Sequence, residues 1–414
     1  MNSLPSPDEL AARAAGDGEL GLAVRHWTGG LRLEVGDRLY GFSVDGGEIR
    51  PGVPPPGPEV ITVSGPAEVW EPVLRGVPPR FAHALSVMLR LGLRLDADPL
   101  RYWQYLPALE RLVELLRPGV PRPQPDEGGP VPRHDAPVGG YVHVELADLD
   151  HRLYYERAGT GIPMLLQHTA GAHSVQWRHL FERPEITDRF QLIAYDLPFH
   201  GKSIPPVGQR WWEEPYQLTS GFLRQVPVAL ARVLELDRPV FMGCSVGGLL
   251  ALDLALNHPD RFRAVIAVEG SLHIGGDPAE LTGFWHPQVS NQTKARLMES
   301  LCSPTSPEAY VKEVSQVYSA GWPPAFLGDL HYYMVEFDLR ARVAEIDTNQ
   351  VGVHILNGEY DYSGTVEMGV AAHRAIPGST HTVMSGVGHF PMQENPAEFV
   401  RHLLPILDAV AASA

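Results

Sequence analysis

The sequence predicts an α/β fold: a mostly parallel eight-stranded sheet with a helical lid, preceded by a small α+β domain. Three observations support this prediction. Short apolar runs of buried-strand length alternate with helical stretches through residues 141–412, a pattern typical of a parallel sheet covered on both faces. A proline-rich stretch at 117–140 separates this region from the preceding residues. The chain has 414 residues, more than one ordinary core requires, which favours two or three domains.

The first predicted domain covers residues 1–116. LRLEVGDRLYGFSVDGGEI (31–49) alternates apolar and polar residues around Gly-Asp and Asp-Gly-Gly turns, which predicts a β-hairpin. VITVSGP follows as another strand, AEVWEPVLRG as a short helix, and YWQYLPALERLVELLR as an amphipathic helix. Proline then fixes φ and removes backbone donors, so residues 117–140 are expected to form a semi-extended linker.

The second predicted domain covers residues 141–414. Runs 141–148 and 151–159 alternate apolar and polar residues, as a starting antiparallel hairpin does. Six further strands are expected at 163–169, 190–198, 239–245, 264–270, 352–361 and 380–389. The long interruption between the sixth and seventh strands, at about 272–345, is interpreted as a helical lid.

Composition limits the partners that the chain is expected to have. A formal net charge of −16 argues against nucleic acid and against a basic membrane-surface footprint. No apolar run approaches the roughly 18 residues that span a bilayer, so stable membrane insertion is not expected. The N-terminus lacks the pattern of a signal peptide, and only two cysteines occur, which together favour a cytoplasmic location. The expected partner is a hydrophobic small molecule.

Ser245 occupies the position typical of a catalytic nucleophile. GCSVG (243–247) follows the buried run PVFM and precedes the helical LLALDLALNHP. A tight turn from strand to helix crowds the backbone, so it needs small residues such as Gly243 and Gly247 on either side of the serine. The amides at the start of the helix can stabilise negative charge. Alone, a G-x-S-x-G pattern is weak, and its placement between a strand and a helix is what carries the prediction.

A serine hydroxyl needs a base and an orienting acid to act as a nucleophile. His389 follows the last predicted strand and Asp361 the preceding one, so both are expected at the same edge of the sheet as Ser245. We therefore predict a Ser245–Asp361–His389 triad. Glu359 is the competing acid, but it lies nearer the strand and on its opposite side.

Residues 141–412 resemble the α/β-hydrolase superfamily, of the lidded esterase and carbon–carbon hydrolase type. The resemblance rests on LLQHTAGAH (165–173), DLPFHGKS (196–203), GCSVGG (243–248) and GHFPMQENP (388–396). It implies an oxyanion hole formed by the backbone N–H groups of Val246 and Ala170. Relatives with an aspartate at the elbow open epoxides or remove halides, so Ser245 favours acyl transfer to water instead.

Two residues depart from the motifs of this superfamily. Thr169 replaces the glycine of a His-Gly pair, and Phe199 replaces the first glycine of the turn Pro-Gly-His-Gly. Thr169 either distorts the oxyanion loop or adds a hydroxyl to the substrate pocket; we expect a formed hole. His168 and His173 flank this loop, but two histidines without a third ligand do not predict a metal site. We expect no metal and no cofactor.

The substrate pocket is expected to include Thr169 and three large aromatic residues of the lid, Trp285, Trp322 and Tyr332. The alternative is that these aromatics only pack the lid onto the sheet. The sequence thus predicts a hydrolase cleaving an ester, thioester or lactone bond of a hydrophobic molecule through an acyl-enzyme. A carbon–carbon bond hydrolase and a ligand-binding protein on a hydrolase scaffold remain open alternatives.

The N-terminal domain resembles the sterol-carrier-like (SCP2-like) fold. The resemblance rests on the Asp-Gly-Gly hairpin, on SGPAEVW before a helix, and on LGLRLDAD, where that family has a glycine-containing strand ending in acid. It implies binding of lipid in an apolar tunnel. The alternative is a small α+β domain that serves dimerisation, giving a homodimer, or that shields the active site.

Overall fold

The computed structural model describes residues 4–125 and 134–413. These residues form two compact units: unit 1 comprises Met1–Pro123 and Gly283–Thr305, and unit 2 comprises Gln124–Thr282 and Ser306–Ala414. Residues 126–133, within the predicted linker, lie outside the described part of the chain. The stretch predicted as a lid is divided, because residues 283–305 belong to unit 1 and its flanks to unit 2.

Unit 1 contains a five-stranded sheet with the strand order β3-β2-β1-β4-β5. Its strands are β1 (Gly29–Val35), β2 (Arg38–Asp45), β3 (Glu48–Pro51), β4 (Val60–Gly65) and β5 (Arg94–Asp96). The hairpin expected at 31–49 is present as β1 and β2, which pair antiparallel from Gly29 opposite Val44 to Val35 opposite Arg38. Only β1 and β4 run parallel among these pairs, so the sheet is mixed.

Six helices belong to the described residues of unit 1. They are α1 (Pro7–Gly16), α2 (Gly18–Val24), α3 (Ala67–Val73), α4 (Leu85–Met88), α5 (Pro99–Leu116) and α10 (Asn291–Glu299). Ser6 and Glu9 form a reciprocal capping box at the start of α1, and Asp98 caps α5 just before Pro99. Buried residues of α1 to α5 and of the sheet form one core, which includes Trp27 and Trp70.

Ion pairs connect α10 to α5 within unit 1. Arg296 of α10 lies 2.6 Å from the carboxylate of Glu114 of α5 and also pairs with Glu299. Burial would raise the pKa of Glu114, but Arg296, Arg117 and Arg111 outweigh it and lower that pKa to about 2. A charge removed from this network would leave its partners buried and unpaired, so α10 and α5 depend on each other.

Unit 2 contains the predicted eight-stranded sheet, with the order β13-β12-β11-β10-β8-β9-β7-β6. Its strands are β6 (Val138–Leu146), β7 (Leu149–Ala158), β8 (Ile162–Gln167), β9 (Phe190–Tyr195), β10 (Val240–Cys244), β11 (Ala264–Val268), β12 (Gly352–Gly358) and β13 (Thr380–Met384). The strands β13, β12, β11, β10, β8 and β9, which are neighbours in this order, run parallel. By contrast, β7 pairs antiparallel with both β9 and β6. The prediction of a mostly parallel sheet with an antiparallel starting hairpin is confirmed.

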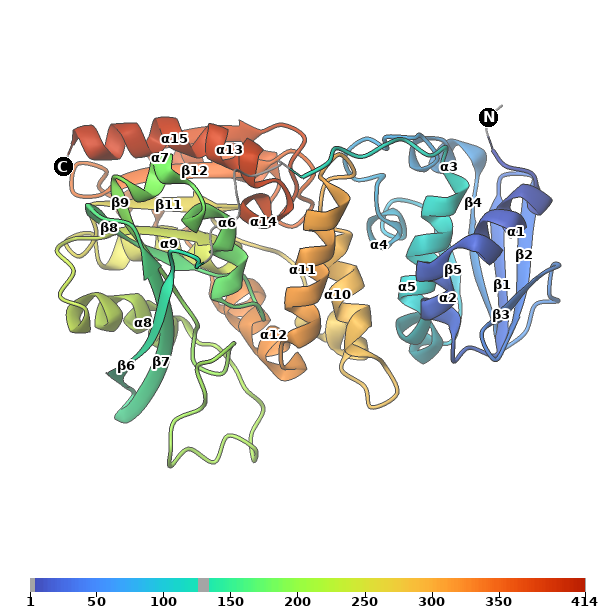
Figure 1. The fold of residues 1–414 in the computed structure, drawn as a ribbon, viewed down its shortest axis with the longest axis horizontal. Helices are drawn as coiled ribbons and strands as arrows, with labels where there is room; N and C mark the ends of the chain where they lie inside the picture. Colours follow the sequence, from blue (N-terminus) through green and yellow to red (C-terminus); the bar gives the residue numbers. More distant parts are fainter. Residues whose placement is uncertain (1–3, 126–133, 414) are drawn as a thin grey trace. The chain divides into compact units, whose positions relative to one another are not determined.

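Helices cover both faces of this sheet. Figure 1 shows α15 on one side of the strands and α8 on the other. The helices of unit 2 are α6 (Arg178–Phe181), α7 (Pro184–Thr187), α8 (Ser220–Val233), α9 (Val246–Asn257), α11 (Glu308–Ala320), α12 (Pro323–Leu330), α13 (Val366–Ala375), α14 (Pro391–Glu394) and α15 (Pro396–Ala412), with short turns η1 (Ser174–Trp177), η3 (His331–Glu336) and η4 (Val343–Glu345).

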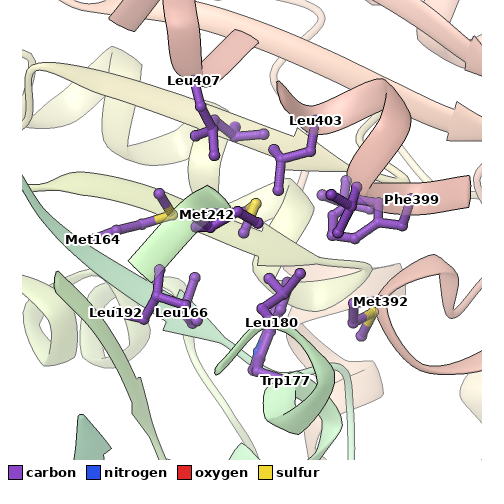
Figure 2. Packing of buried hydrophobic residues seen from close by; sticks show 14 of the residues in the cluster. Met164, Leu166, Trp177, Leu180, Leu192, Met242, Met392, Phe399, Leu403 and Leu407 are labelled. Carbon is purple, nitrogen blue, oxygen red and sulfur yellow. The ribbon is translucent and has the colours of Figure 1, made fainter. Parts of the chain in front are cut away.

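The core between the sheet and α15 is well filled. Met164, Leu166 and Met242 point from the strands toward Leu403 and Leu407 of α15 (Figure 2). Alternate residues of β10 and β11 face the opposite side, and every residue of both strands is buried. A strand buried on both faces must be apolar along its whole length, which explains the continuous runs seen in the sequence. Within residues 4–125 and 134–413, none of the helices combines the length and apolar character needed to cross a membrane.

Candidate active site

The candidate site lies at the carboxyl edge of the unit 2 sheet. Strands β8, β10, β12 and β13 run parallel, so the residues that follow them emerge at one edge. Ser245 follows β10 directly, Asp361 comes three residues after β12, and His389 five residues after β13. The loop after β8 contains Thr169 and Ala170. This edge is where open α/β sheets bind their ligands.

Ser245 forms a strained turn between β10 and α9. Its φ of 59° and ψ of −114° lie in a region that residues with a side chain rarely adopt. A Cβ on Gly243 would lie 2.4 Å from the backbone of Gly247, and a Cβ on Gly247 would lie 2.8 Å from the carbonyl oxygen of Gln167. The two glycines therefore permit the turn, as the sequence predicted, and the turn directs Ser245 to the sheet edge.

His389 and Asp361 are joined by a short hydrogen bond. The distance from His389 Nδ1 to Asp361 Oδ2 is 2.7 Å, and both side chains are buried. The backbone of His389 also lies beside the turn of Ser245, because the neighbouring thiol of Cys244 donates to the His389 carbonyl oxygen at 3.2 Å. The structure thus brings the predicted base against the predicted acid, and next to the turn that carries the serine.

Asp361 is held by its own loop as well as by the histidine. Its two carboxylate oxygens accept hydrogen bonds from the backbone N–H groups of Ser363 (2.7 Å) and Gly364 (3.0 Å). Burial would raise the pKa of Asp361, but His389 and the N–H of Ser363 outweigh it, and the pKa lies below its usual value. Asp361 is therefore anionic at neutral pH. The competing acid Glu359 instead accepts from the N–H of Gly386 at 2.9 Å.

A second buried acid, which sequence reasoning missed, lies beside Asp361. Glu269 follows β11, is fully buried, and accepts the N–H of Gly358 on both carboxyl oxygens at 2.9 and 3.0 Å. Its side chain also shares a hydrogen bond with Asp361. Burial, and then the charge of Asp361, raises the pKa of Glu269 well above its usual value. We therefore infer that Glu269 is protonated at neutral pH and donates a hydrogen bond to the carboxylate of Asp361.

The side chain of His168 holds the loop after β8 through hydrogen bonds to backbone groups. The Nε2 atom of buried His168 accepts the N–H of Leu197 at 3.1 Å, and its Nδ1 lies 2.8 Å from the carbonyl oxygen of Thr169. Burial lowers the pKa of His168 to about 3, so its ring is neutral. Across the described chain, the N–H groups of Ala170 and Val246 make no hydrogen bond to a protein acceptor.

The hydroxyl of Thr169 is hydrogen-bonded to other side chains of the protein. It hydrogen-bonds the Gln176 side chain at 3.0 Å and also the hydroxyl of Tyr318 from α11. The backbone N–H of Thr169 donates to the same oxygen of Gln176 at 3.0 Å. Its side chain is therefore engaged in holding the loop in place, and its predicted contact with substrate stays a prediction.

The three aromatic residues predicted for the pocket lie in different surroundings. Trp285 belongs to unit 1 and is 52% exposed. Trp322 stacks on Phe199 in unit 2. The hydroxyl of buried Tyr332 donates to Asp253 of α9 at 3.3 Å. Their roles toward substrate remain predictions.

The neighbour of Tyr332 contacts the predicted triad. The hydroxyl of Tyr333 lies 3.0 Å from that of Ser363 and hydrogen-bonds the Ser245 side chain. The sequence contains adjacent tyrosines, and only the irregular turn η3 decides which of the two reaches Ser245. No periodicity in the sequence predicts that choice.

No group of three or more His, Cys, Asp or Glu residues in the described part of the chain is placed to hold a metal ion. Both nitrogens of His168 are occupied by backbone groups, as described above. The thiol of Cys244 is buried, and this burial raises its pKa well above the usual value, so it stays protonated.

Comparison with known proteins agrees with this fold. The family model of the alpha/beta hydrolase fold matches residues 162–396. A pimeloyl-(acyl-carrier protein) methyl ester esterase from Vibrio vulnificus is 26% identical over 267 residues, covering 61% of this chain and 96% of the relative. An uncharacterized protein of Mycobacterium tuberculosis is 26% identical over 270 residues, covering 60% of this chain and 76% of the relative.

Solved structures are similar to the same part of the chain. A thermophilic esterase from Thermogutta terrifontis superposes with a TM-score of 0.57 at 20% identity, covering 66% of this chain and 99% of the esterase. A bromoperoxidase from Bacillus anthracis gives a TM-score of 0.56 at 19% identity, covering 65% and 100%.

The chain belongs to the α/β-hydrolase family, whose model spans more than half of it. The prediction that it is a hydrolase enzyme is confirmed by this membership together with its esterase relative.

Proposed function

We propose that this protein is a serine hydrolase that cleaves an ester, thioester or lactone bond of a hydrophobic small molecule. The observation that carries the proposal is the 2.7 Å bond between His389 and a buried, anionic Asp361, beside the strained turn of Ser245. A fixed acid that orients a histidine next to a serine is the arrangement that activates a hydroxyl nucleophile.

The proposed reaction begins with attack of Ser245 Oγ on the carbonyl carbon of the substrate. His389 takes the hydroxyl proton, and Asp361 stabilises the resulting imidazolium through Nδ1. The N–H groups of Val246 and Ala170 bind the oxyanion of the tetrahedral intermediate. His389 then returns its proton to the leaving alkoxide or thiolate, which departs as the alcohol or thiol. Water attacks the acyl-enzyme by the same route and releases the acid.

An apolar substrate is favoured by the residues around the proposed triad. The ring of Phe390 lies edge-on to His389, with centroids 4.9 Å apart, and the aromatic pair Phe199 and Trp322 lies on the same unit. The net charge of −16 disfavours an anionic head group. An ester as the scissile bond is supported by the methyl ester esterase among the relatives.

A panel of chromogenic esters, lactones and thioesters of graded acyl length tests this proposal, with wild-type protein and Ser245→Ala. We expect hydrolysis by the wild type alone, and each added methylene should raise kcat/KM several-fold, about 0.8 kcal/mol, until the pocket is full. With a vinylogous diketone added to the panel, activity confined to that compound would point to carbon–carbon bond hydrolysis. Binding without turnover of any substrate would indicate a ligand-binding protein.

We further propose that unit 1 is SCP2-like and binds a lipid. The hairpin β1–β2 and the strand β4 followed by α3 agree with the motifs that suggested this resemblance. Because residues 283–305 belong to unit 1, deleting residues 1–138 would remove the partner of α10, so full-length protein is required for the test.

A fluorescent sterol or fatty-acyl probe, titrated into protein whose Ser245 is blocked by a phosphonate, measures lipid binding away from the nucleophile. Saturable binding supports a lipid site, whereas its absence contradicts one. Light scattering on the same sample measures mass, and a dimer without probe binding would favour the dimerisation role for unit 1.

A further inference from the structure

The oxyanion loop, residues 168–173, is held by side chains from a distant part of the chain. The segment inserted between β11 and β12 contributes α11 and α12 to unit 2. Tyr318 of α11 hydrogen-bonds the hydroxyl of Thr169, one residue before Ala170. Asp329 of α12 accepts the backbone N–H of Gly171, one residue after Ala170, at 2.7 Å. The proposed oxyanion donor therefore lies between two anchors from this segment.

The contact between α12 and the loop leaves no free space. Gly171 has φ of 64°, and a Cβ built on it would lie 2.6 Å from the Cβ of Phe326. A side chain there would have both a strained backbone conformation and a clash with Phe326 of α12. The glycine thus allows the loop to approach α12 closely enough for Asp329 to reach its N–H.

Asp329 is itself fixed by a buried charge. Its Oδ2 lies 2.8 Å from Nε2 of His200, and both side chains are at most 1% exposed. Burial would lower the pKa of His200, but Asp329 outweighs it and the pKa is raised. The hydroxyl of Tyr216 approaches the other oxygen of Asp329 at 3.3 Å. The carboxylate is thus satisfied on both oxygens and cannot rotate without breaking these bonds.

Both departures from the superfamily motifs are matched by residues of the inserted segment. The hydroxyl introduced by Thr169 is used by Tyr318, and the ring introduced by Phe199 stacks on Trp322, with centroids 6.4 Å apart. Phe199 adopts a φ of 72°, the conformation that the usual glycine would take easily. The ring of Phe199 also lies 4.7 Å from that of Tyr216, so the inserted segment supplies part of the packing around this strained residue.

We propose that Asp329 is a positioning residue for the oxyanion hole: from α12 it fixes the N–H of Gly171 and so aims the N–H of Ala170. This inference rests on the proposed function. Asp329 acts through the loop and touches no reacting atom. Its expected contribution is to the geometry of the transition state, where the negative charge on oxygen develops, and not to binding of the ground state.

The test compares Asp329→Ala, Asp329→Asn and Tyr318→Phe with wild type on one ester. Loss of an oxyanion donor typically costs about 10²–10³ in rate, and a misplaced donor should cost less, so we expect kcat to fall about 10–100-fold in Asp329→Ala with little change in KM. Affinity for a trifluoromethyl ketone, which forms a tetrahedral adduct, should fall by a similar factor. Asp329→Asn keeps an acceptor for Gly171 and should recover part of the loss.

Glu313→Gln is the matched control. Glu313 of α11 pairs with His179 at 2.9 Å, so it is also a carboxylate of the inserted segment bound to a histidine, but it does not touch the oxyanion loop. We expect its thermal stability to fall and its kcat to stay near that of wild type. Tyr318→Phe and Asp329→Asn keep the test decisive if Asp329→Ala does not fold.

The inference alone would be overturned if wild type is active and the Asp329 variants have a kcat no lower than that of Glu313→Gln. It would also be overturned if the Asp329 variants have a raised KM and an unchanged kcat. A wild type that hydrolyses no ester, lactone or thioester would overturn the proposed function and this inference together.

Discussion

The two sides of the candidate site are built in different ways. On the acid–base side, Ser245, Asp361 and His389 each follow a strand of one parallel sheet, and Asp361 is supported by its own loop and by Glu269 after β11. On the oxyanion side, the loop after β8 relies on Tyr318 and Asp329, which are 149 and 158 residues away from the loop residues they bond. The first side is specified mainly by the sheet, with one contact to Ser245 from Tyr333 of the inserted segment, whereas the second depends on that segment for two anchors.

This difference predicts how substitutions on the two sides of the site should differ in effect. Changes in the inserted segment can alter the oxyanion loop while the nucleophile, base and acid keep their places on the sheet. Variants on the two sides should therefore differ in size of effect, with the acid–base side costing more because it supplies the reacting groups.

The largest loss is expected from removing the nucleophile or the base. Ser245→Ala and His389→Ala should each lower kcat by about 10⁴–10⁶, and the double variant should be hardly worse than either single one, because the two residues act as a unit. Steady-state kinetics of the three variants on one ester measures this. Losses that multiply would show that the residues act separately and would contradict the proposed triad.

A smaller loss is expected at the acid. Asp361→Asn should lower kcat by up to about 10⁴, because the amide cannot stabilise the imidazolium and can hold the wrong tautomer of His389. Glu359→Gln serves as the matched control, since Glu359 bonds the N–H of Gly386 instead. An equal loss in both variants would mean that the acid has been misassigned.

Glu269 gives a prediction on stability. Glu269→Gln keeps an acceptor for Gly358 and a donor to Asp361, so its kcat should stay far closer to wild type than that of Asp361→Asn. The pKa of Glu269 is higher in the folded than in the unfolded protein, so its bound proton stabilises the fold fully below about pH 4.3. This stabilisation is lost as the pH rises through the folded-state pKa.

Urea unfolding of wild type and Glu269→Gln across this pH range measures the effect. As the pH rises, the free energy of unfolding of Glu269→Gln should increase relative to that of wild type by up to about 1.4 kcal/mol per pH unit. A difference that does not vary with pH would mean that Glu269 is ionised in the folded protein.

The smallest effects are expected from the adjacent tyrosines. Tyr333→Phe removes a hydroxyl that bonds Ser245 and should change kcat, whereas Tyr332→Phe removes one that bonds Asp253 and should cost about 0.5–1.5 kcal/mol of stability with kcat unchanged. Kinetics and thermal unfolding of both variants distinguish these roles. The opposite pattern would restore Tyr332 to the substrate pocket.

Sequence reasoning predicted the sheet, its starting hairpin and the approach of Asp361 to His389, because strand ends in a parallel sheet meet at one edge. The same rule applied to AVIAVEG would have found Glu269, which ends the neighbouring strand. Asp329 and Tyr318 left no such signal, since an inserted segment returns to the sheet by tertiary packing. The division of the predicted lid was missed for the same reason: α10 bonds α5 through Arg296 and Glu114, far apart in the chain.

The most direct test of the proposed serine mechanism is intact-mass and peptide mass spectrometry after reaction with a fluorophosphonate. The account predicts one phosphonyl adduct per chain, located on Ser245, formed with loss of ester hydrolysis and absent from Ser245→Ala. An adduct on another residue, or undiminished hydrolysis by protein labelled at Ser245, would contradict it.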